Sequence, residues 1–330
     1  MTAWLAFALS GALIAIAGAR LARAGDTIAA GTGLGGMWVG AILVAGATSL
    51  PELTTDAHAI LQGNRDLAVG DLFGSSMANM MILAVADLLT HNTRLLTRVA
   101  INQALVGVLA IFLTAVAVLG ILGRSSVGIL GLGWPVAAVG VSYVAGMRLL
   151  HRNREEPPFR TPAEVAEAAP GRRALRRAVI EFSAATLVIF VTAPYLAGAG
   201  AGLADQLGIA QGFVGMLFLA ITTSLPEAAV TAASLRAGWY NLAIGNLLGS
   251  NCFNMAALVP LDAIDGPGSL LGRADPTLAL AGIFAVLLMG LALLDVLNKS
   301  ERRIWAVEPG PALMMLTYCA ALYLLYQGAR

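Results

Sequence analysis

Long apolar stretches dominate the chain, and its polar residues gather in the segments between them. Ten of these stretches reach or approach the roughly 20 residues that a helix needs to cross about 30 Å of hydrocarbon. They cover residues 3–19, 34–61, 67–89, 99–122, 127–150, 178–201, 209–235, 242–264, 278–297 and 309–326. The pattern therefore predicts an all-α integral membrane protein with ten transmembrane helices.

The composition excludes a water-soluble fold. Of the 330 residues, 58% are hydrophobic and only 12% are charged, whereas roughly a quarter of a soluble domain is charged. The formal net charge of +1 argues against an electrostatic nucleic-acid binder, so we expect no nucleic-acid partner. The two cysteines, Cys252 and Cys319, lie in apolar runs and form neither a disulfide framework nor a zinc site.

One long polar connection, residues 151–177, separates a first unit of five helices, residues 1–150, from a second, residues 178–330. Most of the lysines and arginines fall in this connection or on the same side of the membrane, and cytoplasmic loops retain positive charge. We therefore expect a cytoplasmic linker and termini outside the cytoplasm. We expect the protein in the bacterial inner (plasma) membrane.

The two units carry the same motif. Residues 48–52 read Thr-Ser-Leu-Pro-Glu, and residues 223–227 repeat it at an offset of 175. The offset also pairs Gly70 with Gly245, Gly74 with Gly249, Ser75 with Ser250 and Asn79 with Asn254. The repeated segments run from about residue 45 to 90 and from about 220 to 265. Because each unit has an odd number of helices, we expect inverted-topology repeats, the architecture typical of secondary transporters.

Each motif places a glutamate, Glu52 or Glu227, inside an apolar span, where a charge costs at least roughly 2.5–3.5 kcal/mol. The preceding proline, Pro51 or Pro226, removes a backbone N–H and obstructs the carbonyl four residues earlier. We therefore expect both helices to kink there. Carbonyls of the preceding turn would then face a polar cavity, the setting in which broken backbone is tolerated at this depth.

Further oxygen-bearing side chains repeat beside the glutamates. Two pairs are spaced i and i+4, each on one helix face: Ser75 with Asn79, and Ser250 with Asn254. The motifs add the hydroxyls of Thr48, Ser49, Thr223 and Ser224. Such oxygens suit calcium and sodium rather than zinc or copper. For the serines and asparagines the structural alternative is helix-to-helix hydrogen bonding.

The paired motifs, followed by Gly-Asp-Leu-Phe-Gly-Ser-Ser at 70–76 and Gly-Asn-Leu-Leu-Gly-Ser-Asn at 245–251, resemble the two alpha-repeats of the sodium/calcium exchanger branch of the calcium:cation antiporters. The resemblance covers both repeats strongly and the ten-helix plan more loosely. It implies a secondary active antiporter that exchanges calcium for sodium by alternating access. It implies no enzyme activity and no cofactor.

Carried over position by position, the resemblance implies that Glu52 and Glu227 are the central calcium ligands, aided by the carbonyls of Thr48 and Thr223. It further implies sodium sites that adjoin or overlap the calcium site, formed by Ser49, Ser75, Ser224, Ser250, Asn79 and the carbonyls of Ala45 and Ala220. Family members often carry an aspartate at the position of Asn254, so this chain has lost a carboxylate there.

A second departure lies in the first repeat. Asp71 stands where its repeat partner is Asn246 and where the family more often has asparagine. Asp71 is therefore an additional ligand candidate, a candidate carrier of a coupling proton, or a cap on the vestibule. Asp56, one turn after Glu52, is another additional candidate, although its repeat partner is Thr231.

These departures leave alternatives open. A proton-coupled antiporter of calcium or another cation on the same fold is the main one. An intramembrane aspartyl protease, built from Asp71 and another membrane aspartate, is a distant one. Asp87 and Asp262 repeat at the same offset but lie near span ends, where we expect structural roles. The expected partners are calcium, sodium and the lipid bilayer, and the oligomeric state is left open, a monomer included.

Overall fold

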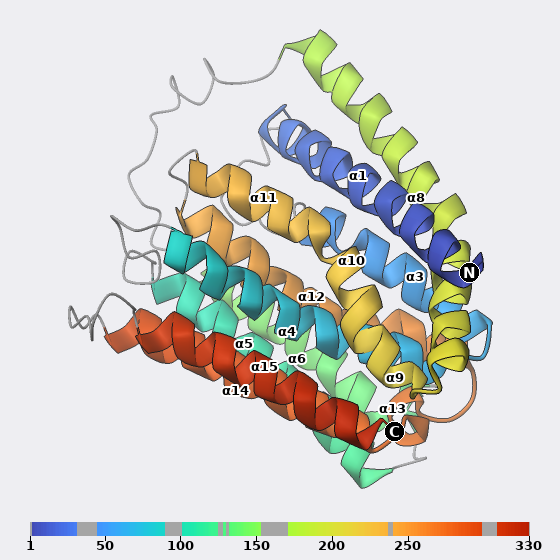
Figure 1. Ribbon diagram of the computed structural model, residues 1–330. Helices are drawn as coiled ribbons and strands as arrows, with labels where there is room; N and C mark the ends of the chain where they lie inside the picture. The colour runs from blue at the N-terminus through green and yellow to red at the C-terminus, as the bar shows by residue number, and fades with distance from the viewer. Residues whose placement is uncertain are drawn as a thin grey trace.

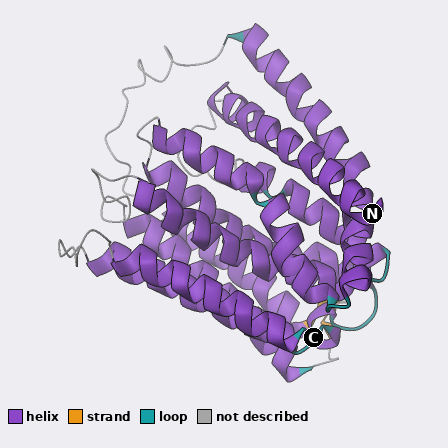
Figure 2. Ribbon diagram, viewed as in Figure 1, coloured by secondary structure: helices purple, strands orange, loops and turns teal. Residues whose placement is uncertain are grey.

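The computed structural model describes residues 2–31, 45–89, 101–124, 128–129, 132–152, 171–236, 240–298 and 309–329. Within these ranges the protein is helical apart from short turns and one small hairpin, as Figure 2 shows. The long helices are α1 (Thr2–Gly31), α4 (Arg65–Leu89), α5 (Ile101–Gly123), α6 (Trp134–Arg152), α8 (Arg172–Leu207), α12 (Tyr240–Asp265), α14 (Thr277–Asn298) and α15 (Pro309–Gly328).

Shorter elements connect or interrupt these helices. The helical ones are α3 (Leu50–Leu61), α9 (Gln211–Val214), the π-helix η2 (Gly215–Leu219), α10 (Ala220–Thr223), α11 (Leu225–Arg236) and α13 (Leu270–Arg273). The hairpin consists of β1 (Gly128–Ile129) and β2 (Leu132–Gly133).

Seven described helices are long and apolar enough to cross a membrane. They lie where the sequence predicts the first, third, fourth, sixth, eighth, ninth and tenth spans. The seventh predicted span is broken, because Gln211–Thr223 and Leu225–Arg236 meet at 41°. The fifth is represented by the shorter apolar helix Trp134–Leu150. Residues 34–44 of the second predicted span, and 153–170 of the predicted linker, lie outside the described residues.

The fifth span starts later than its apolar pattern predicts. A helix from residue 127 is wrong, because Gly128 pairs with Gly133 and Ile129 with Leu132 in an antiparallel hairpin. The hairpin is fixed by α12 and the loop after it. The N–H of Gly133 donates to Asp262 at 2.7 Å, and a Cβ on Gly133 would overlap the side chain of Ser269. Such distant contacts cannot be found from an apolar run of glycine and leucine.

Asp262 has the structural role that its position near a span end predicts. Its carboxylate also accepts the N–H of Leu270, the first residue of α13. The two bonds tie α12 to both the hairpin and α13. The side chain is fully buried, and buried carboxylates need such donors.

Two pairs of helices form opposite sides of the bundle. In Figure 1, α1 and α8 lie side by side along one edge, while α14 and α15 lie at the other, with α4 and α12 between them. The outer faces of α1 and α8 are apolar, and Leu5 and Leu187 are 63% and 65% exposed. Large exposed apolar surfaces of this kind are suited to lipid rather than to water. The chain is therefore a multi-pass, nearly all-helical membrane protein.

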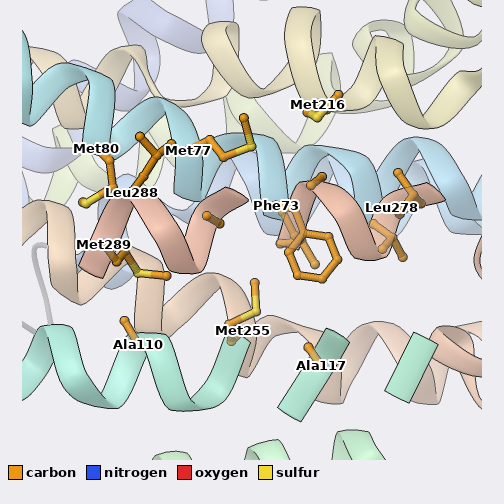
Figure 3. Close-up of a cluster of buried hydrophobic side chains, with 14 of the residues drawn as sticks. Phe73, Met77, Met80, Ala110, Ala117, Met216, Met255, Leu278, Leu288 and Met289 are labelled. Carbon is orange, nitrogen blue, oxygen red and sulfur yellow. The ribbon is translucent and has the colours of Figure 1, made fainter. Parts of the chain in front are cut away.

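The interior core lies around α4. Phe73, Met77 and Met80 of this helix meet Leu288 and Met289 of α14 in the cluster of Figure 3. Met255 of α12 and Met216 of η2 belong to the same cluster. The methionines therefore pack the core, as flexible thioethers commonly do.

Close backbone contact joins α4 to the broken seventh span. A Cβ on Gly70 would overlap the carbonyl oxygen of Gly212, and one on Gly74 would overlap that of Met216. Conversely, a Cβ on Gly215 would overlap the carbonyl oxygen of Leu67. Small residues permit this approach between membrane helices. The contact holds the motif of the second unit against the helix that carries Asp71 and Ser75.

The element boundaries repeat with the sequence. Helix α3 begins at Leu50 and α11 at Leu225, and α4 begins at Arg65 and α12 at Tyr240. Helices α6 and α15, which begin at Trp134 and Pro309, keep the same separation of 175. The internal similarity of the sequence thus extends to where helices start.

Candidate cation-binding site

The two motifs break their helices at the same position. Ser49, just before α3, has φ −87° and ψ 4°, and Ser224, just before α11, has φ −83° and ψ 3°. Each break lies two residues before a proline, whose missing N–H and bulky ring interrupt the helix. The kink that Pro226 predicts is confirmed by the 41° bend. Both glutamates therefore stand in the first turn of the helix that follows a break.

Carbonyls next to the breaks are engaged within their own helices. The carbonyl of Ala45 accepts the N–H of Ser49 at 3.0 Å, and that of Ala220 accepts the N–H of Ser224 at 3.0 Å. These two candidate ligands are thus not freed by the break in this arrangement. Each also accepts a hydroxyl, that of Thr48 at 3.1 Å for Ala45 and that of Thr223 at 3.5 Å for Ala220. Because a carbonyl oxygen has two lone pairs, a cation binds either carbonyl only in competition with these donors.

Helix α1 covers both breaks. A Cβ on Gly18 would overlap the ring of Pro226 and would lie 3.4 Å from the Cγ of Pro51. The glycine thus brings the backbone of α1 onto both proline turns. Both glutamates are almost completely shielded, with Glu52 2% and Glu227 0% exposed.

Hydroxyl groups from both repeated segments converge on Glu227. Its Oε1 atom accepts the hydroxyl of Ser49 at 3.4 Å and that of Ser250 at 3.3 Å. The hydroxyl of Thr48 lies 3.5 Å from that of Ser250. The other oxygen, Oε2, is buried and has no hydrogen-bond partner among the described residues. Glu227 is therefore held by one oxygen and leaves the other available to a ligand.

Asp71 accepts hydroxyl groups in the first repeated segment, as Glu227 does in the second. Its Oδ1 atom accepts the hydroxyl of Thr223 at 3.3 Å and that of Ser75, one turn later on α4, at 3.5 Å. Its Oδ2 atom is buried and has no hydroxyl, amide or backbone donor in the described part of the chain, and the Asp71 carboxyl lies within side-chain hydrogen-bonding reach of Asp56. Oε2 of Glu52 and the hydroxyl of Ser224 are buried without a partner among the described residues.

Four carboxylates thus share one buried region. Glu52 interacts electrostatically with Glu227, Asp71 and Asp56, and Asp56 interacts with Asp71. All four are at most 2% exposed, and none forms an ion pair with a basic side chain that the structure describes. Buried carboxylates without such partners require a proton or a bound cation.

A cation held here needs more than carboxylates. Among the described residues, no three histidine, cysteine, aspartate or glutamate side chains are grouped closely enough to hold a metal ion by themselves. Hydroxyl, amide and carbonyl oxygens must complete the coordination shell. This mixed set of hard oxygens suits Ca²⁺ or Na⁺ and is foreign to zinc and copper.

The asparagines of the two repeats are not equivalent in the structure. The amide of Asn79 donates to Oδ1 of Asn251 at 2.8 Å, and Asn251 donates to the carbonyl of Ser76 at 3.4 Å. Asn254 has no partner among the described residues, although it is 1% exposed. Asn246 donates to the backbone carbonyl of Glu227 at 3.4 Å.

Two of these residues, Asn246 and Asn251, are missing from the candidate ligands that the sequence suggests. Asn251 differs from its repeat partner Ser76, so strict repetition does not reveal it. A search for amides on the buried face of 245–251, repeated or not, would have found both.

Comparison with known proteins is consistent with this arrangement. The model of the sodium/calcium exchanger protein family matches residues 2–143 and 178–327. The putative antiporter CaxA of Alkalimonas amylolytica is 27% identical over 97% of this chain and 98% of its own length. The inner membrane protein YrbG of Escherichia coli K12 is 30% identical over 84% of this chain and 82% of its own.

Solved structures show the same fold. The H⁺/Ca²⁺ exchanger CAX superposes with a TM-score of 0.75 at 14% identity, over 98% of this chain and 85% of its own. The sodium-calcium exchanger NCX_Mj superposes with a TM-score of 0.61 at 20% identity, over 98% of both chains. With the family model matched across most of its length, this chain belongs to the sodium/calcium exchanger family of membrane antiporters.

Proposed function

We propose that this protein exchanges calcium for sodium across the membrane by alternating access, with Glu52 and Glu227 as the central cation ligands. One observation carries the proposal. Two glutamates from repeated motifs are shielded from solvent, have no basic partner in the described chain, and each keeps one unpartnered oxygen. Such a pair is costly unless cations neutralise it.

The remaining ligands are assigned by combining the resemblance with the geometry. Glu52 and Glu227 hold calcium together with the carbonyls of Thr48 and Thr223. The proposed sodium ligands are Ser49, Ser75, Ser224, Ser250, Asn79 and the carbonyls of Ala45 and Ala220. The hydroxyl bonds from Ser49 and Ser250 to Glu227 support a site shared between the two motifs. Asn254 is a further proposed ligand, and both atoms of its buried amide have no partner among the described residues.

We further propose that the chain has ten transmembrane helices in two inverted five-helix units, residues 1–150 and 178–330, joined by a cytoplasmic linker. The recurrence of helix starts at an interval of 175 residues supports this organisation. Termini outside the cytoplasm follow from the distribution of arginine. The name of the relative from Escherichia coli supports an inner-membrane location.

Obligatory exchange follows from electrostatics. Moving unneutralised glutamates through the low-dielectric interior is unfavourable, so the site reorients only when it is occupied. One divalent ion or several monovalent ions satisfy the same oxygens. Calcium movement in one direction is therefore tied to monovalent cation movement in the other.

Proton coupling is the second candidate for the driving ion. The specific observation in its favour is Asp71, a third carboxylate at a position where the second repeat has Asn246. Among the structural relatives are an H⁺/Ca²⁺ exchanger and a sodium-calcium exchanger. On this alternative a proton on a buried carboxyl replaces sodium as the counter-ion.

Flux measured under one gradient at a time separates these candidates. Purified protein in proteoliposomes is loaded with sodium, with potassium or with acidic buffer, and uptake of radioactive calcium is followed. We expect a sodium gradient to drive uptake, and potassium or proton gradients to drive none. Uptake driven by a pH gradient in sodium-free buffer would replace sodium with protons in the proposal.

A further inference from the structure

The two halves of the buried site each hold one carboxylate in the same way, but the residue held differs. Glu227 uses one oxygen to accept two hydroxyls, and Asp71 does the same. The second oxygen of each has no donor among the described residues, although the Asp71 carboxyl also neighbours that of Asp56. Each accepts one hydroxyl from its own unit and one from the other. If the repeats were equivalent, the carboxylate that accepts two hydroxyls in the first repeat would be Glu52, the partner of Glu227 at the offset of 175.

Asp71 takes one of the two hydroxyls that the repeat would supply to Glu52. Ser75 is the partner of Ser250, which donates to Glu227, yet Ser75 donates to Asp71. The partner of Ser49 is Ser224, whose hydroxyl has no acceptor among the described residues.

Local helix geometry explains why Ser75 donates to Asp71 and not to Glu52. Asp71 lies four residues before Ser75 and therefore on the same face of α4, so their side chains meet without any change in the helix. In the second repeat, Asn246 occupies the corresponding position. Its amide donates to the backbone carbonyl of Glu227, and it does not take the serine hydroxyl from the glutamate.

We propose that Asp71 is a further carboxylate ligand of the transported cations, anchored in the first half of the site as Glu227 is in the second. It would bind alongside hydroxyl oxygens rather than as one of three carboxylates around a single ion. The inference rests on the proposed function, since it names a further ligand of the same site. Glu52 then contributes its charge from a carboxylate with fewer fixed contacts. The second oxygens of Glu52 and Glu227 are buried and unpartnered within the described chain. The Asp71 carboxyl has the Asp56 carboxyl as its neighbour, and a cation can replace the proton that the two would otherwise share.

The test is calcium binding by Asp71→Asn, which places in the first repeat the residue that the second carries. Calcium chloride is titrated into purified protein in sodium-free buffer and followed by calorimetry. We expect the dissociation constant to rise at least about tenfold, the effect of losing a charged ligand. The melting temperature without calcium should not fall, because the variant removes a buried charge, and its increase on adding calcium should shrink.

Asp66→Asn is the matched control. Asp66 lies on α4 as well, but it accepts the N–H of Asp275 at the end of the helix, so calcium affinity should be unchanged. If Asp71→Asn does not fold, Asp71→Ser, which is neutral and smaller, provides the same test. Wild-type affinity in the neutral variant would overturn the inference while leaving Glu52 and Glu227 as ligands. Failure of the wild-type protein to bind calcium would overturn the proposed function itself.

Discussion

At the scale of single residues, hydrogen bonding decides which oxygens remain for a cation. Glu227 and Asp71 each spend one oxygen on hydroxyl donors and keep the other. Asn79 follows the same logic, because its NH₂ group donates to Asn251 and its Oδ1 atom remains without a partner in the described chain. The protein thereby orients acceptors toward the site with neighbours that need not touch the ion.

Replacing Asn251 by alanine tests this orienting role. The variant removes the acceptor that fixes the amide of Asn79, a buried hydrogen bond whose loss costs about 1 kcal/mol. We expect the sodium concentration for half-maximal calcium exchange to rise about fivefold while the maximal rate stays the same.

Ser76→Ala is the control for that measurement. Ser76 is the repeat partner of Asn251, and among the described residues its hydroxyl bonds only to the carbonyl of Leu72 in its own helix. Its sodium dependence should match the wild type. An Asn251→Ala variant with unchanged sodium dependence would contradict the orienting role.

At the scale of elements, the sequence predicts the long helices and the broken seventh span well, because apolar length and proline act locally. The candidate ligands of both motifs are identifiable from repetition alone. Contacts between distant segments cannot be identified from the sequence in this way. The hairpin before Trp134, for example, depends on Asp262 and Ser269. The bond from Thr223 to Asp71 likewise joins distant segments, whereas the bond from Ser75 to Asp71 follows from their spacing of four residues on one helix.

The glycines of α4 and α12 differ in what they contact, which makes a prediction possible. A Cβ on Gly74 would overlap the backbone of Met216, whereas one on its repeat partner Gly249 would lie at an ordinary 3.5 Å from the Cβ of Ala45. Gly74→Ala should therefore destabilise the protein by about 1–3 kcal/mol, the usual cost of overpacking.

Thermal unfolding in detergent measures this difference. We expect the melting temperature of Gly74→Ala to fall by several degrees and that of Gly249→Ala to remain within about one degree of wild type. Equal melting temperatures for the two variants would show that the close contact between α4 and η2 does not contribute to stability.

At the scale of the whole molecule, the proposed organisation has two similar units that contribute to one buried region without being chemically identical. Repetition of helix starts and of the Thr-Ser-Leu-Pro-Glu motif supports the inverted-repeat organisation. Asp71 against Asn246 and Ser76 against Asn251 break the equivalence inside the site. If the protein is the proposed exchanger, its two halves therefore contribute different ligands to the same cations.

Sodium-gradient-driven uptake of radioactive calcium by Glu52→Gln and Glu227→Gln proteoliposomes tests the central claim most directly. Glu181→Gln is the control, since Glu181 is exposed on α8 and pairs with Arg177. We expect both site variants to lose uptake completely, because glutamine keeps the shape but not the charge that binds calcium, and the control to transport as wild type does. Retained exchange in either purified, folded site variant would contradict the assignment of the glutamates as the central ligands.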